Sequence, residues 1–137
     1  MKIVVIDDSV KNPVELKESK EFSYTPTGKI KEYIEAGKLW HFIAWSNNEK
    51  IGFSHKGKVL SLNHSHIKSV AINYVEPAKG DGWVSLVVIL LEANGYCSLI
   101  ESSTYSEKAL NWFLENKKTL ENLFNKTITI NDRGKDY

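Results

Sequence analysis

The residues best suited to chemistry are the histidines His41, His55, His64 and His66, the last two of which stand two positions apart. In a strand that spacing places both imidazoles on one face, as a metal site would require. A zinc site, however, needs three or four ligands held about 2 Å from the ion. No HExxH or comparable spacing supplies the others. We therefore interpret residues 63–66 as a polar turn and expect no bound metal.

The lone cysteine, Cys97, is a second candidate, because a histidine could activate its thiol as a nucleophile. It lies within an extended apolar segment, however, where a cysteine usually acts as a small buried hydrophobe. Serine-hydrolase elbows, glycine-rich phosphate loops and paired-histidine motifs are absent from the sequence. We therefore expect a non-catalytic protein without a cofactor, and an unrecognised enzyme remains an alternative.

A group of aromatic and basic residues could instead bind a ligand. Its members are Trp40, Phe42, Trp45, Phe53, Lys50, His55, Lys56 and Lys58. Aromatic faces with basic flanks can stack single-stranded nucleic acid, although such aromatics more often belong to a core. The alternation of side chains along 40–45 predicts that one set is buried and the other is partly exposed.

Composition narrows the class of protein. At 137 residues the chain fits one domain, and 18 basic against 17 acidic residues give a net charge of +1. This near-balance argues against a broad nucleic-acid surface. The N-terminal apolar run is too short for a signal peptide, and Trp83–Leu91 is far shorter than the roughly 20 residues that cross a bilayer. With a lone cysteine, the expected location is the cytoplasm.

Short extended segments separated by turn residues dominate the chain. We expect strands at Lys2–Asp7, Val14–Leu16, Leu39–Ser46, Ile51–His55, Val59–Leu62, Ile67–Val75, Trp83–Glu92 and Tyr96–Glu101. The dipeptide Asn94-Gly95 indicates a type I′ hairpin, and Pro77 should end the strand before it. Strands joined by tight turns pair in antiparallel fashion, because a parallel pair needs a long crossover.

Two helices are predicted. A short one opens at Thr27, buries the face of Ile30, Tyr33 and Ile34, and ends at Gly37. The second begins with a capping box formed by Thr104 and Glu107 and runs to about Phe124. Its apolar stripe comprises Leu110, Phe113, Leu114, Leu120, Leu123 and Phe124. A short strand, Thr127–Ile130, and a frayed tail, 131–137, follow.

These elements predict an α+β fold of one domain, 1–137, in which an antiparallel sheet or partly open β-barrel is closed by the C-terminal amphipathic helix. Over about residues 40–124 the chain resembles the bacterial pleckstrin-homology-like domains. The resemblance rests on the segments 51–53, 56–58, 59–62 and 67–70, on the hairpin of 83–91 with 96–100, and on the closing helix. Residues 1–37 are then an addition to a 39–124 core. The resemblance implies that Lys56 and Lys58 could meet an anionic lipid headgroup.

The segment Trp83–Leu91 is apolar on both faces, with Ser85 as its only polar member. A strand with one solvent-exposed face would alternate, so both of its faces must be covered. The candidates for the second cover are the 27–37 helix, the first strand and a second copy of the chain.

We therefore expect a non-catalytic module that binds another protein through a sheet edge, an exposed aromatic face or the flank of the helix. Small cytosolic adaptors and inhibitors, including immunity proteins, have this size and lack of chemistry, and a homodimer is a further option. The alternative is a module for anionic lipid or single-stranded nucleic acid, although the charge balance argues against nucleic acid and membrane. The candidate binding residues are Trp40, Trp45, Lys56, Lys58, His64 and His66.

Overall fold

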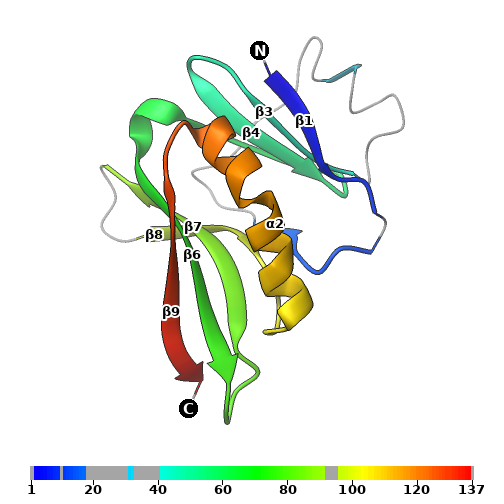
Figure 1. The fold of residues 1–137 in the computed structure, drawn as a ribbon. Helices are drawn as coiled ribbons and strands as arrows, with labels where there is room; N and C mark the ends of the chain where they lie inside the picture. Colours follow the sequence, from blue (N-terminus) through cyan, green and yellow to red (C-terminus); the bar gives the residue numbers. More distant parts are fainter. Residues whose placement is uncertain (1, 10, 18–30, 33–40, 92–95, 137) are drawn as a thin grey trace.

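The computed structural model describes residues 2–9, 11–17, 31–32, 41–91 and 96–136, and its strands form two sheets (Figure 1). The first sheet has the order β1-β3-β4-β5 and is antiparallel throughout. Its strands are β1 (Lys2–Asp7), β3 (Phe42–Ser46), β4 (Lys50–His55) and β5 (Lys58–Asn63). The α+β class is thereby confirmed, but the strands form no closed barrel.

Local turn chemistry sets the hairpins of this sheet. Between β3 and β4, the side-chain oxygen of Asn47 accepts the backbone N–H groups of Glu49 (2.8 Å) and Lys50 (2.7 Å). Between β4 and β5, Lys56 and Gly57 have φ values of 49° and 79°, the two positive values that a type I′ turn requires. Both hairpins therefore depend on turn residues that can be recognised in the sequence.

The second sheet has the order β2-β8-β7-β6-β9. Its strands are β2 (Glu15–Leu16), β6 (Ile67–Pro77), β7 (Trp83–Leu90), β8 (Tyr96–Glu101) and β9 (Ile128–Asp136). The edge strand expected near Val14–Leu16 is confirmed. The expected end of the sixth strand before Pro77 is wrong, because Pro77 is its last residue and lies opposite Asp136 of β9.

The C-terminal strand corrects two predictions. β9 continues to Asp136, so residues 131–136 are not a frayed tail. It also pairs parallel to β6. This is possible because α2 (Glu107–Phe124) serves as the long crossover between β8 and β9, two strands that point the same way. A hydrogen bond from the Asn131 amide to the Asn73 oxygen (2.8 Å) joins β9 to β6 in the middle of this pair.

Helix α2 begins two residues later than its predicted cap. Ser106, in extended conformation, is the N-cap, and its hydroxyl accepts the N–H of Ala109 at 3.0 Å. The capping box at Thr104 is therefore wrong, because the backbone reaches helical geometry only after Ser106. The left-handed Asn125 (φ 55°, ψ 42°) ends the helix, as is common at C-caps.

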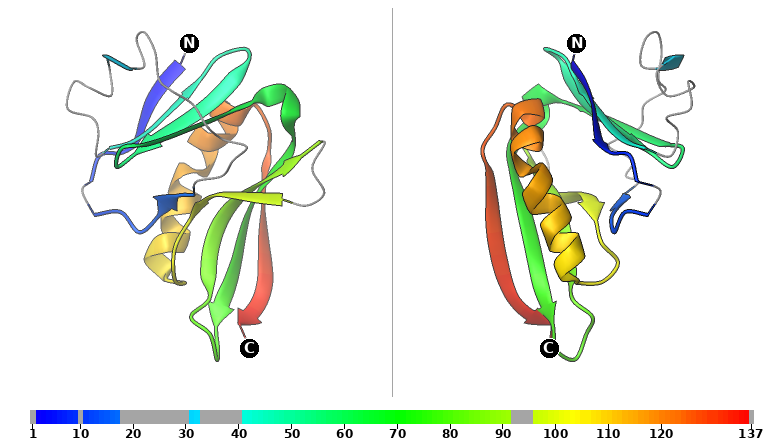
Figure 2. Two further views of the ribbon diagram at one scale, coloured as in Figure 1. Left: turned by 180° about the vertical axis from the view of Figure 1, so that it is seen from behind. Right: turned by 45° about the vertical axis from the view of Figure 1, so that its right-hand side comes forward.

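The helix fills the angle between the two sheets (Figure 2). One continuous core joins side chains from both sheets and α2. The Phe42 ring meets Trp112 at 5.1 Å between centroids, and the Phe53 ring meets Phe124 at 5.9 Å. The buried helix stripe is rotated from the predicted one: Trp112 and Ala109 are buried, whereas Leu114 is 41% exposed.

The predicted N-terminal helix at 27–37 lies outside the described residues, apart from Lys31 and Glu32, which are helical. The first strand, β1, pairs with β3. Its residues Val4 and Ile6 pack against the main core.

Candidate functional site

Of the aromatic residues singled out in the sequence, those that the structure describes are buried and form no exposed platform. Trp40 lies outside the described residues. Trp45 is buried on the face of the four-stranded sheet that points away from the main core, where it groups with Ile43, Ile3, Val5 and Val59. Because Phe42 and Ala44 are also buried on the opposite face, both faces of β3 are covered. The prediction of one partly exposed set along this strand is wrong for the residues described.

Lys56 and Lys58 lie where the sequence places them, exposed in the turn between β4 and β5. The structure does not bring His64 or His66 to them, because these residues form the short 3-10 helix η2 (His64–His66) after β5. The candidate binding residues that the structure describes therefore do not form one site.

His64 occupies a polar cavity of about 360 Å³ at the C-terminal end of α2. The Ser46 hydroxyl donates to the Leu123 carbonyl oxygen (2.9 Å) and lies 2.9 Å from His64 Nε2. Because its hydrogen is directed at the Leu123 carbonyl, the Ser46 hydroxyl accepts a hydrogen bond from the Nε2–H of His64. His64 Nδ1 has no hydrogen-bond partner among the described residues, so no carboxylate orients the ring as in a catalytic triad.

His66 is exposed, and His55 is buried elsewhere. Within the described ranges, no three His, Cys, Asp or Glu side chains gather closely enough to hold a metal ion. Cys97 is half-buried and packs against the main core.

His55 joins the N-terminal segment to the core. Its Nε2 lies 2.8 Å from the Asn12 amide nitrogen, and its ring packs on Phe42 at 4.7 Å. Burial and the positive charge of Lys56 lower the pKa of His55 to about 4, so the imidazole is neutral at pH 7 and accepts the Asn12 N–H. The role of His55 is structural.

The face of the five-stranded sheet opposite α2 is a candidate binding surface of the described fold. Figure 2 shows α2 beside β6, β7 and β9, and the side of these strands that points away from it is here called the outer face. Cross-strand pairing places small side chains next to one another there: Asn73 opposite Ser85, and Ala71 opposite Val87. These four side chains are buried, while Trp83 and Ile89 at either end of β7 are half-buried.

A pocket of about 400 Å³ opens on the outer face beside β7 and β8. The described residues that line it are Gly82, Trp83, Ser85, Val87, Ser98, Glu101, Ser102 and Ser103. A β-bulge between Leu86 and Val87 shifts the register against β8. Because a bulge re-aims the side chains beside it, Ser98 and Glu101 both reach the same pocket.

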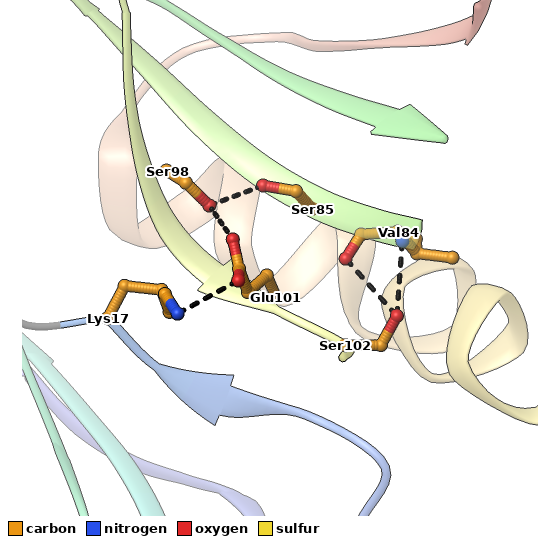
Figure 3. A network of polar contacts seen from close by, with 6 residues as sticks. All are labelled: Lys17, Val84, Ser85, Ser98, Glu101 and Ser102. Atoms are coloured by element: carbon orange, nitrogen blue, oxygen red, sulfur yellow. Dashed lines mark hydrogen bonds and ion pairs between the residues drawn. The ribbon is translucent and has the colours of Figure 1, made fainter. Parts of the chain in front are cut away.

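A chain of polar contacts crosses the floor of this pocket (Figure 3). The hydroxyls of Ser85 and Ser98 lie 2.6 Å apart, and the Ser98 hydroxyl donates to Glu101 Oε2 at 2.9 Å. The ammonium group of Lys17, just beyond β2, meets Glu101 Oε1 at 2.9 Å. This arrangement orders a carboxylate and two hydroxyls in a partly apolar hollow. No histidine or cysteine is among the described residues that line the pocket.

Ser102 fixes the end of the pocket. Its hydroxyl donates to the Thr104 carbonyl at 2.6 Å and accepts the Val84 N–H at 3.1 Å, while its own N–H bonds Val84 O at 2.8 Å. The end of β8 is therefore locked onto the start of β7.

Sequence reasoning identified β7 as apolar on both faces but did not select the serines and Glu101. Small polar residues in strands form no recognisable sequence motif. The available signal was Ser85, a lone hydroxyl within an apolar strand, which indicates a polar contact on the outer face.

Of the helices described, none is long and apolar enough to cross a membrane. The family model for the PM0294 C-terminal domain matches residues 2–135. Neither the curated proteins nor the solved structures provide a match.

Proposed function

The chain belongs to the PM0294 C-terminal domain family, and from its five-stranded sheet we propose that it is a non-catalytic module that binds another protein, as a small adaptor or inhibitor does. The family name carries no activity. The proposal therefore depends on the geometry of the outer face. The lone cysteine favours a reducing compartment, so we propose that the protein acts in the cytoplasm.

The observation that carries this proposal is the outer face itself. An antiparallel sheet commonly turns a polar face to water, but here the half-buried Trp83 and Ile89 lie at either end of β7, with the buried Ala71 and Val87 between them. Aromatic and aliphatic side chains around a hollow are the usual centre of a protein interface, where buried anchors supply most of the affinity.

The size of the face fits a modest interface. Four strands spaced about 4.8 Å apart, each about eight residues long, span roughly 500 Å². A standard interface buries about 800 Å² on each partner. A partner must therefore also contact the flanking loops or the β9 edge, which is nine residues long.

The lipid and nucleic-acid alternatives have less support. Lys56 and Lys58 are exposed in one turn, but each lysine near an anionic membrane contributes only about 1 kcal/mol. The aromatic residue nearest them among the candidate binding residues described, Trp45, is buried and cannot stack on a base. No observation on the described residues adds to these two lysines.

The proposal can be tested by site-specific photo-crosslinking in the native host. A benzoylphenylalanine at Thr129, exposed on the outer face, should trap one recurrent protein, whereas the same group at Lys118, exposed on α2, should not. The trapped protein is then purified and its affinity measured by calorimetry. Ile89→Lys should weaken binding about tenfold or more, because a charge buried without a partner is costly, and Lys118→Glu should leave it unchanged.

Three results would contradict the proposal. The first is the absence of an adduct specific to position 129. The second is full affinity of the Ile89→Lys variant, provided that its melting transition shows it folded. The third is an adduct formed only with a second copy of the chain, which would make the outer face a homodimer contact.

A further inference from the structure

We propose that the outer-face pocket receives an arginine side chain of the partner protein, whose guanidinium pairs with Glu101 while its stem lies along Trp83. This inference rests on the proposed function and names the chemistry of the partner at that same face. It follows from the charges at the pocket, the contacts of Glu101 and the shape of the lining.

The charges at the end of the pocket are unbalanced. Glu101 is the only charged residue among the described ones that line it. Its direct cross-strand partner in β2 is another carboxylate, Glu15. Like charges directly opposite each other in a sheet are unfavourable, and Lys17 is a cation that contacts Glu101 of this pair. A second cation would therefore be stabilised at this position.

The carboxylate is oriented in advance. Ser98 holds Oε2 from inside the pocket, and Ser85 in turn contacts Ser98. The Glu101 side chain is 30% exposed, so it remains accessible from the pocket, and Lys17, at 47% exposed, holds Oε1 from outside. An exposed lysine–carboxylate pair contributes only about 0–1 kcal/mol. Exchanging Lys17 for an incoming group is therefore inexpensive.

Arginine fits this pocket better than lysine. Its planar guanidinium matches a carboxylate with two parallel hydrogen bonds and stacks on aromatic faces, whereas an ammonium group is compact and strongly hydrated. Trp83 and Val87 offer an apolar wall for the methylene stem, and the hydroxyls of Ser102 and Ser103 line the far end. A volume of about 400 Å³ is ample for one such side chain.

The test uses the full chain, labelled with ¹⁵N, and N-acetyl-arginine-N-methylamide as the probe. The matched probes are the corresponding citrulline derivative, which has nearly the same shape without charge, and the lysine derivative. We expect saturable shifts of the Trp83 indole and of the Ser98 and Glu101 amides with the arginine probe. The lysine probe should bind more weakly, the citrulline probe should give no saturable shifts, and added salt should weaken binding of the arginine probe.

Two variants should change the affinity for the arginine probe in opposite directions. Glu101→Gln should weaken the arginine probe tenfold or more, whereas Lys17→Ala should tighten it severalfold by freeing Oε1. Glu49→Gln, in the exposed turn between β3 and β4, is the matched control and should change nothing. Dispersed spectra of each variant confirm that it is folded.

Equal shifts with the citrulline probe, no saturable shift with arginine, or unchanged affinity in Glu101→Gln would each overturn the arginine proposal. The photo-crosslinking result is independent of this experiment. If position 129 still traps a partner whose binding needs Ile89, the proposed function stands and only the chemistry of the pocket is wrong.

Discussion

The buried imidazole of His55 should make the stability of the protein depend on pH. Its pKa is about 4 in the folded protein, because burial and then Lys56 disfavour the charged form, against an ordinary value of 6.5. The unfolded chain therefore binds more protons between these values, and stability falls as the pH drops from 6.5 to 4. The loss amounts to about 3 kcal/mol when the pH is well below both values.

Replacing His55 by Gln should remove this part of the pH dependence. The variant keeps a group that can accept the Asn12 N–H, so it should fold, and its free energy of unfolding should change little between pH 6.5 and 4.5. Urea unfolding at several pH values measures this. Asp7 titrates below this pH range: burial alone would raise its pKa, but hydrogen bonds from Ser9 and Trp112 and the charge of His55 lower it below 3.8. Parallel pH profiles for the two proteins would contradict the assignment.

Two neighbours on β4 should respond in opposite ways to a change to alanine. A Cβ at Gly52 would collide with the Trp45 indole, so Gly52→Ala should cost about 1–3 kcal/mol. The Ser54 hydroxyl is buried without a hydrogen-bond partner among the described residues. Ser54→Ala should therefore stabilise the protein by about 1 kcal/mol. Thermal unfolding of both variants tests the pair, and a stabilised Gly52→Ala would show that the indole can move aside.

At the scale of elements, the predicted N-cap of α2 and the observed one differ. Ser106→Ala should destabilise the protein by about 1 kcal/mol, because it removes the acceptor for the Ala109 N–H. Thr104→Ala is the matched control and should have little effect, since Thr104 accepts only through its backbone carbonyl in the recorded bonds. Denaturant unfolding compares them. A larger effect at Thr104 would restore the capping box that the sequence predicts.

Elements defined by local signals were predictable from the sequence, and those defined by distant contacts were not. β1 and β8 have the predicted bounds, and the β4–β5 turn follows from Lys56-Gly57. The parallel pairing of β9 depends on β6, some 60 residues earlier in the chain, and no local pattern encodes it. The outer-face pocket was missed for the same reason: Ser98 and Glu101 meet Ser85 only through the register of β7 with β8.

At the scale of the whole molecule, residues 2–9 and 11–17 add contacts between the two sheets and α2 to those of the shared core and the Ser46–Leu123 hydrogen bond. β1 extends the four-stranded sheet, β2 extends the five-stranded sheet, and Val14 and Leu16 are fully buried between them. Asp7 accepts the Trp112 indole N–H at 2.7 Å, and Asn12 contacts His55. The N-terminal segment is therefore bonded to both sheets and to α2.

Deleting residues 1–17 should consequently abolish cooperative folding. It exposes the edge of β3, an apolar strand prone to pairing with other chains, and opens the core at Val14 and Leu16. The intact chain should melt in one transition, with circular dichroism and tryptophan fluorescence coincident, because both sheets share one core. The truncated chain should aggregate on purification. A soluble truncated protein with one sharp transition would show that the two sheets and α2 form a stable unit without this segment.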